Sequence, residues 1–114
     1  MDTRSTVMAW DTALRYADWG RARSLLTDDA TYIAPDPPID CAGPDDIIEL
    51  MRSFKGVNPD VELLELAVIG DSAIASLRQP AWDADWFQVI TVADDHIARL
   101  EDFATREAAL AAIG

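Results

Sequence analysis

The sequence predicts one α+β domain, because helical and strand patterns occupy different parts of its 114 residues. Apolar residues recur at helical spacing in most of the chain up to about residue 54, apart from one short strand and a proline-rich loop. From residue 60 onward the pattern changes to alternation or to continuous apolar runs, which are typical of strands. Helices followed by an antiparallel sheet are the mark of the α+β class. The length and a hydrophobic content of 50% fit a single domain over residues 1–114.

Two helices are expected in the first quarter of the chain. Val7 and Trp10 lie at helical spacing on the apolar face of the first helix, and either Thr3 or Ser5 can cap its start. Asp18 is a candidate N-cap for a second, shorter helix. Both helices therefore precede the first expected strand.

The next stretch combines a short strand, a loop and a third helix. We expect a strand from Ala30 to Ala34. The prolines between Pro35 and Gly43 predict a loop there, since proline lacks a backbone donor. Pro44, followed by two aspartates in the first helical turn, predicts a helix that ends near Gly56.

The second half of the chain is expected to form a meander of strands closed by a helix. Thr105 is the candidate N-cap of an alanine-rich helix over Arg106–Ile113. The four expected strands are Val61–Ile69, Ala73–Arg78, Trp82–Val92 and His96–Phe103.

The amino-acid composition disfavours several classes of binding partner. The net charge of −12 and a pI of about 4.1 argue against nucleic acid and against anionic membrane surfaces, and the acidic surface disfavours anionic ligands. No apolar run approaches the roughly 20 residues that span a bilayer, and no signal-peptide core follows Met1. The single cysteine, Cys41, cannot form an internal disulfide, so a cytoplasmic location is expected.

Several stretches together resemble the SnoaL-like branch of the nuclear transport factor 2-like superfamily. They are Tyr16–Trp19 with Leu25–Thr31, Gly43–Phe54, and Phe87–Val89 with His96–Phe103. The resemblance covers nearly the whole chain and implies a cone-shaped, curved antiparallel sheet wrapped around the N-terminal helices, a cystatin-like roll. It also implies a hydrophobic pocket for a small molecule and a homodimer formed through the outer face of the sheet.

The catalytic residues of two enzyme groups in this superfamily are not matched. Ketosteroid isomerases use an aspartate base, for which this chain has Ala34. Their tyrosine falls on Trp10, and their second acid falls near Gln88. Epoxide hydrolases of this fold need an Arg-x-Asp pair on the strand that here spans Ala73–Ser76, which carries no charge.

One acidic position does match. Asp102 corresponds to the acid/base aspartate of SnoaL-like polyketide cyclases, which close a ring by aldol condensation without a metal or an organic cofactor. The histidine that often accompanies it in the family is missing, because His96 falls at a hairpin turn.

Strand alternation bears on Asp102 independently of the family. If Leu100 points inward, Asp102 does too, since they are two residues apart. A buried carboxylate without a cationic partner has a raised pKa, as a general acid/base near neutrality requires. The alternative is that Asp102 lies at the strand end, in solvent or in a local salt bridge.

Aromatic residues supply the candidate binding residues. Trp82, Trp86 and Gln88 share one face of a strand, where two indoles could clamp a planar ligand and the amide could orient a carbonyl. Trp10 could join them, and Tyr32 could place a hydroxyl in the pocket. The alternative is that the tryptophans belong to the core or to an interface, and that the tyrosine hydroxyl lies in water.

Other chemistries find no support in the sequence. One cysteine and one histidine do not make a zinc site, and nucleotide-binding or Gly-x-Ser-x-Gly motifs are missing. Three functions stay open. They are a cofactor-free cyclase, isomerase or lyase acting on a carbonyl compound, a non-catalytic protein that binds a small hydrophobic molecule, and an interaction module that uses its sheet.

Overall fold

The computed structural model describes residues 2–35, 38–57, 61–80 and 83–113. Its helices and strands are α1 (Thr3–Arg15), α2 (Trp19–Ser24), β1 (Leu26–Pro35), β2 (Pro38–Ala42), α3 (Pro44–Val57), β3 (Glu62–Ile69), β4 (Ser72–Gln79), β5 (Ala84–Ala93), β6 (His96–Phe103) and α4 (Arg106–Ile113).

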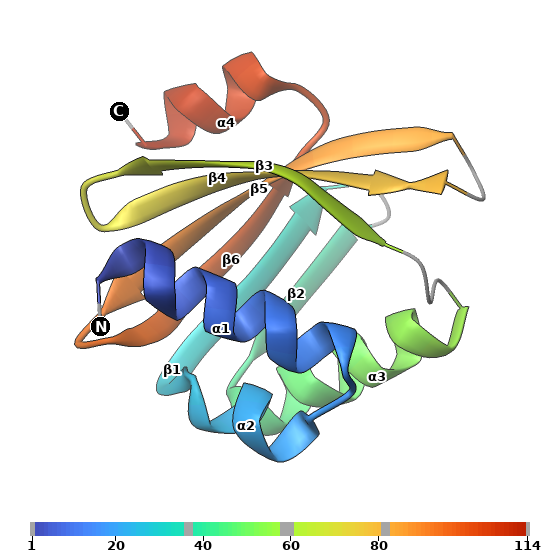
Figure 1. Cartoon of the computed structure of the whole chain (residues 1–114), viewed down its shortest axis with the longest axis vertical. Coiled ribbons are helices and arrows are strands. Elements are labelled where there is room, and N and C mark those ends of the chain that lie inside the picture. The colour runs from blue at the N-terminus through green and yellow to red at the C-terminus, as the bar shows by residue number, and fades with distance from the viewer. Residues whose placement is uncertain (1, 36–37, 58–60, 81–82, 114) are drawn as a thin grey trace.

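The strands form one sheet in the order β2-β1-β6-β5-β4-β3. The expected antiparallel sheet is mixed, because β1 and β6 pair in parallel while the other neighbours are antiparallel. The reason lies in the connection: α3 carries the chain from β2 at one edge to β3 at the other, and three hairpins then bring β6 back beside β1 (Figure 1). The first and last strands therefore meet in the middle of the sheet.

Helices cover both faces of the curved sheet. α1, α2 and α3 lie on one face and α4 lies on the other (Figure 1). The main core fills the space between the first three helices and the sheet, and it includes Trp10, Ile47, Ile97 and Leu100, each at most 3% exposed. No described helix has the length and apolar character needed to cross a membrane.

The expected loop over Pro35–Gly43 is wrong, since Pro38–Ala42 forms β2. β2 is an edge strand, where a residue without a backbone donor is tolerated. Pro35 and Pro38 pair with each other at the end of the ladder. β1 is also longer than the expected Ala30–Ala34, because it starts at Leu26 and absorbs an irregularity in its pairing with β6.

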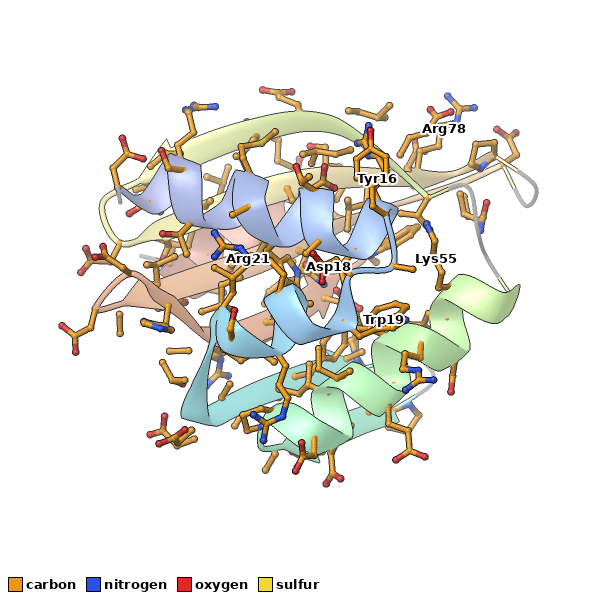
Figure 2. The ribbon with its side chains drawn as sticks, turned by 60° about the horizontal axis from the view of Figure 1, so that its bottom comes forward. Tyr16, Asp18, Trp19, Arg21, Lys55 and Arg78 are labelled. Carbon is orange, nitrogen blue, oxygen red and sulfur yellow. The ribbon has the colours of Figure 1, made fainter. Side chains whose placement is uncertain are left out.

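Helix caps follow the expected chemistry with one exception. The Asp18 carboxylate accepts a hydrogen bond from the Arg21 backbone N–H at the start of α2 (Figure 2), and the Thr105 hydroxyl accepts one from Ala108. The cap of α1 is Asp2 rather than Thr3 or Ser5, since its carboxylate accepts from the Ser5 N–H at 2.7 Å.

Removal of the α2 cap is expected to weaken the fold modestly. Asp18→Ala leaves the Arg21 N–H without its partner and should lower the free energy of unfolding by about 1 kcal/mol in urea denaturation. Glu49→Ala, on the exposed face of α3, serves as the control and should stay within about 0.5 kcal/mol of the wild type. Equal stability of both variants would contradict the capping role.

The last two strands contain a bulge that sequence alternation does not show. Thr91 pairs with Arg99, but Val92 pairs with Ile97, so Ala98 is an extra residue in β6. As a result Ile97 joins the main core together with Leu100, although unbroken alternation would place residues three apart on opposite faces. β5 begins at Ala84, and Trp82 lies outside the described residues.

Candidate functional site

Three polar side chains meet on the inner face of the sheet. The Tyr32 hydroxyl donates to Asp102 Oδ2 at 2.5 Å, and the Gln88 amide nitrogen donates to Asp102 Oδ1 at 2.8 Å. The same nitrogen lies 3.3 Å from the Tyr32 hydroxyl oxygen and donates to it. The three side chains therefore form a closed hydrogen-bonded triangle.

Strand register brings these residues together. Gln88 on β5 lies directly opposite Asp102 on β6, and Tyr32 on β1 pairs with Leu100. Because the bulge lies before Leu100, the alternation from Leu100 to Asp102 is undisturbed, and Asp102 faces inward as that alternation predicts. Tyr32 is 3% exposed and Gln88 is 8% exposed, so both are buried.

Burial controls the electrostatics of the triangle. Desolvation raises the pKa of Asp102 above its ordinary value, although the hydrogen bonds from Tyr32 and Gln88 act in the opposite direction. Desolvation and the neighbouring Asp102 carboxylate raise the pKa of the Tyr32 hydroxyl, which therefore holds its proton at neutral pH. None of the ion pairs between described residues involves Asp102.

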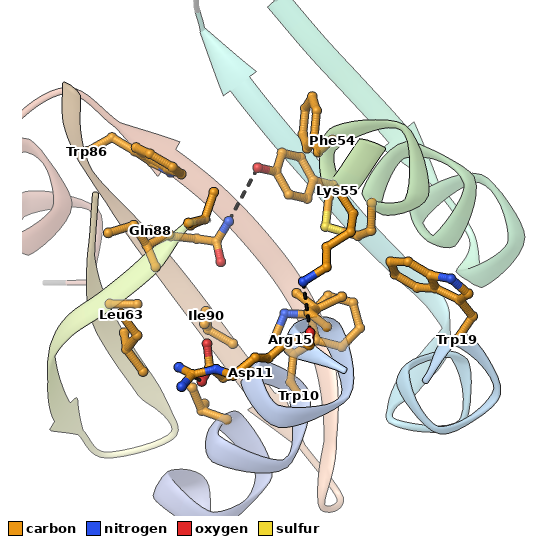
Figure 3. Close-up of a pocket in the computed structure, with 17 residues that line it drawn as sticks. Trp10, Asp11, Arg15, Trp19, Phe54, Lys55, Leu63, Trp86, Gln88 and Ile90 are labelled. Carbon is orange, nitrogen blue, oxygen red and sulfur yellow. Dashed lines mark hydrogen bonds and ion pairs between the residues drawn. The ribbon is translucent and has the colours of Figure 1, made fainter. Parts of the chain in front are cut away.

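A pocket of about 160 Å³ lies between the sheet and the helices, and Tyr32 and Gln88 form part of its wall (Figure 3). Asp102 is not among the lining residues, so it lies behind the other two members of the triangle. The Gln88 amide oxygen points into the pocket, away from Tyr32 (Figure 3). The lining residues are Val7, Trp10, Asp11, Leu14, Arg15, Trp19, Tyr32, Met51, Phe54, Lys55, Val61, Leu63, Ala75, Leu77, Trp86, Gln88 and Ile90.

The structure brings most of the sequence-predicted site residues to this pocket. Trp10, Tyr32, Trp86 and Gln88 all line it, and Asp102 contacts two of them. Trp10 also belongs to the core, as the alternative interpretation of that residue predicts, and its role in ligand binding stays a prediction. The Tyr32 hydroxyl donates to Asp102, and the side chain is buried.

Sequence reasoning missed the charged residues of the pocket. Asp11 and Arg15 follow Val7 by four and eight residues on α1, so helical spacing already placed them on the face of a core residue. Lys55 lies near the end of α3, and Figure 3 shows its side chain reaching toward the end of α1. No sequence pattern marks Lys55, although it is the only lysine in the sequence.

Residues with metal-binding or nucleophilic chemistry lie elsewhere. His96 is exposed at the β5–β6 turn, where its ring nitrogen lies 2.7 Å from the Asp94 carbonyl oxygen. Burial, with Asp46 and Asp40 nearby, raises the pKa of the Cys41 thiol, which is unfavourable for a thiolate nucleophile. Within the described ranges, no three metal-ligating side chains come together.

The fold and this pocket define the class of protein. In this class a curved mixed sheet and the N-terminal helices enclose an apolar pocket between them. A family model described as a SnoaL-like domain matches residues 7–100, and the chain belongs to this family. Comparison with curated protein sequences returns no significant match.

Solved structures show the same fold at low sequence identity. A protein from Sinorhizobium meliloti, provisionally assigned as a polyketide cyclase, is 22% identical with a TM-score of 0.77 and covers 90% of this chain and 100% of its own. A provisionally assigned ketosteroid isomerase from Kribbella flavida is 22% identical with a TM-score of 0.70 and coverages of 91% and 78%. TerC, co-crystallised with polyporic acid, is 17% identical with a TM-score of 0.71 and covers 93% of each chain.

Proposed function

We propose that this protein binds a small organic molecule with an apolar ring and a hydroxyl or carbonyl group. The observation that carries the proposal is the pocket itself. Most of its lining side chains are apolar, and Tyr32 and Gln88 add a hydroxyl and an amide to the wall. A few polar groups that orient a ligand in an otherwise apolar pocket are the usual design of small-molecule sites. The SnoaL-like fold typically serves this purpose, and the pocket favours binding over a module that uses only its sheet.

The size of the pocket limits the ligand. Its volume of about 160 Å³ is below the roughly 300 Å³ of common drug-sized sites. An apolar cavity of about 150 Å³ accommodates a benzene molecule. The proposed ligand therefore places one aromatic ring, or an apolar group of similar size, between Trp10 and Trp86, with the rest of the molecule toward the surface.

Binding of a matched pair of neutral probes tests the proposal. We expect 4-hydroxycinnamamide to bind about fivefold more tightly than cinnamamide in ¹⁵N NMR titrations, because its hydroxyl can donate to Gln88 Oε1 or Tyr32 Oη. Tyr32→Phe should reduce this advantage to about twofold or less. Tyr16→Phe is the matched control, since the only other tyrosine is 75% exposed. If neither probe shifts the indole signals of Trp10 and Trp86, the proposal is wrong.

A second function is favoured by the hydrogen bond between Tyr32 and Asp102. Asp102 does not line the pocket, so we propose that it exchanges protons with a carbonyl ligand through Tyr32. In this step a C–H bond next to the carbonyl breaks, its proton moves to Tyr32 Oη, and the Tyr32 proton moves to Asp102 Oδ2. The electron pair of the C–H bond remains on the ligand as an enolate. The step needs no cofactor.

Phenylacetone provides a simple probe for this chemistry. If the relay operates, the protein accelerates the exchange of the hydrogens next to the carbonyl for deuterium in D₂O, as followed by proton NMR. If phenylacetone binds but exchanges no faster than in buffer, the protein is a binding protein only. The homodimer expected from the family resemblance stays a prediction beside both functions.

A further inference from the structure

We infer that the ligand also carries an acidic group, a carboxylate, which Lys55 and Arg15 bind at the entrance of the pocket. This inference rests on the proposed function, because it names the chemical class of the molecule that occupies the same pocket. It depends on Lys55 and Arg15, whereas the binding of the ligand hydroxyl depends on Tyr32 and Gln88.

Lys55 is placed to bind an anion. Its ammonium donates to the backbone carbonyl oxygen of Arg15 at 2.8 Å, which leaves two of its three donor hydrogens. None of the ion pairs between described residues involves Lys55. The side chain lies between the end of α1 and α3 (Figure 2), and it lines the pocket.

Arg15 adds a second positive charge at the same entrance. Its guanidinium pairs with Asp11 at 3.0 Å, and 57% of the side chain is exposed, so further donor hydrogens remain available. Among the described residues, Asp11 is the one carboxylate that lines the pocket, and Arg15 neutralises it. The described residues that line the pocket therefore carry an excess positive charge, in a chain whose net charge is −12.

The triangle of Tyr32, Gln88 and Asp102 favours one orientation of such a ligand. Asp102 lies behind Tyr32 and Gln88, so an anion placed against these two residues would face a second carboxylate. A neutral hydroxyl or carbonyl fits there, while the carboxylate fits beside Lys55. The negative charge of the surface as a whole disfavours anions. At the entrance, however, the charge of the described lining residues is positive, because Lys55 and Arg15 outnumber Asp11. The ligand class is thus a small aromatic acid with a polar group at the opposite end.

The ligand pair 4-hydroxycinnamate and 4-hydroxycinnamamide isolates the charge, because the two molecules differ only in the terminal group. We expect the wild-type protein to bind the carboxylate about tenfold more tightly than the amide at pH 7.5, as a charge-assisted hydrogen bond allows. Lys55→Gln keeps a donor for the Arg15 carbonyl but removes the charge, and should bring the two affinities within about twofold. Lys55→Arg should retain most of the preference.

Arg52→Gln is the matched control. It removes the same charge one turn earlier on the exposed side of α3, and Arg52 does not line the pocket. Its preference for the carboxylate should equal that of the wild type. If both compounds bind with equal affinity to the wild type, or if Lys55→Gln and Arg52→Gln behave alike, the inference about the acid is wrong while ligand binding stands. If neither compound binds, both the inference and the proposed function are wrong.

The single lysine allows a direct readout. Reductive methylation with ¹³C-formaldehyde labels only Lys55 and the terminal amine, and it preserves the charge at both. We expect 4-hydroxycinnamate to shift the labelled Lys55 signal and the amide to leave it nearly unchanged. An unchanged signal at saturating carboxylate would contradict the contact.

Discussion

Replacement of Ala75 by leucine is expected to abolish ligand binding without loss of the fold. Ala75 lies on β4, is 2% exposed and lines the pocket, so the larger side chain would occupy the space proposed for the ligand ring. The affinity for 4-hydroxycinnamamide should fall by about 100-fold or more. Because the added carbons fill a cavity, the free energy of unfolding should stay unchanged or rise by about 0.5–2 kcal/mol.

Ala73→Leu is the matched control for this prediction. Ala73 lies two residues earlier on the same face of β4, is fully buried, and does not line the pocket. The added carbons have no cavity to enter there and should lower the free energy of unfolding by about 1–3 kcal/mol, with binding retained at temperatures where the protein is folded. If Ala75→Leu destabilised the protein as Ala73→Leu does, the pocket would be closed in solution.

Asp102→Asn is expected to stabilise the protein at neutral pH and to stop proton exchange. Burial raises the folded-state pKa of Asp102 above its unfolded value, so between those two values the folded chain holds a proton that the unfolded chain has lost. Stability therefore falls as pH rises through this window, by about 1.4 kcal/mol for each pH unit that the window spans, and the loss is complete above the folded pKa. Asparagine has no charge and escapes this loss.

The measurement is thermal and urea unfolding of both proteins from pH 3 to pH 8. The two should be similar at low pH, and the variant should be more stable by about 1 kcal/mol or more at pH 7. The asparagine oxygen can still accept from Tyr32, and the Gln88 amide can rotate to accept from the new nitrogen. A less stable variant at pH 7 would instead mark a carboxylate that the fold requires.

The same variant tests the relay. If phenylacetone exchange occurs in the wild type, Asp102→Asn should slow it by about 100-fold, since the base that accepts the Tyr32 proton is gone. Asp40→Asn, a carboxylate on β2 away from the pocket, is the control and should change neither the exchange nor the pH profile. Exchange that survives in Asp102→Asn would assign the proton transfer to another group.

Most of the fold could be predicted because its signals are local. The Asp18 and Thr105 caps and the proline at the start of α3 each depend on residues within one turn. β2 escaped prediction because the prolines at and before its start indicate a loop, and only the position at the sheet edge makes Pro38 compatible with a strand. The parallel pairing of β1 with β6 depends on how the chain crosses the sheet, which periodicity does not report.

Part of the site could also be predicted, because some of its signals are local to one strand. The inward direction of Asp102 follows from its spacing to Leu100, and the shared face of Trp86 and Gln88 follows from theirs. The triangle itself could not be predicted, because the hydrogen bond between Tyr32 and Asp102 needs the pairing of strands that are far apart in the chain. Lys55 was missed because a single cation carries no sequence pattern.

The parallel pairing of β1 with β6 has a consequence for how the protein folds. Tyr32 and Asp102 are 70 residues apart, whereas β3 to β6 are joined by hairpins whose contacts are local. Closing a long loop costs more chain entropy than closing a hairpin, so we expect the hairpins to form early and the two ends of the chain to meet late. Ligand binding would then appear only in the final kinetic phase of refolding. A chain that binds ligand has completed its folding.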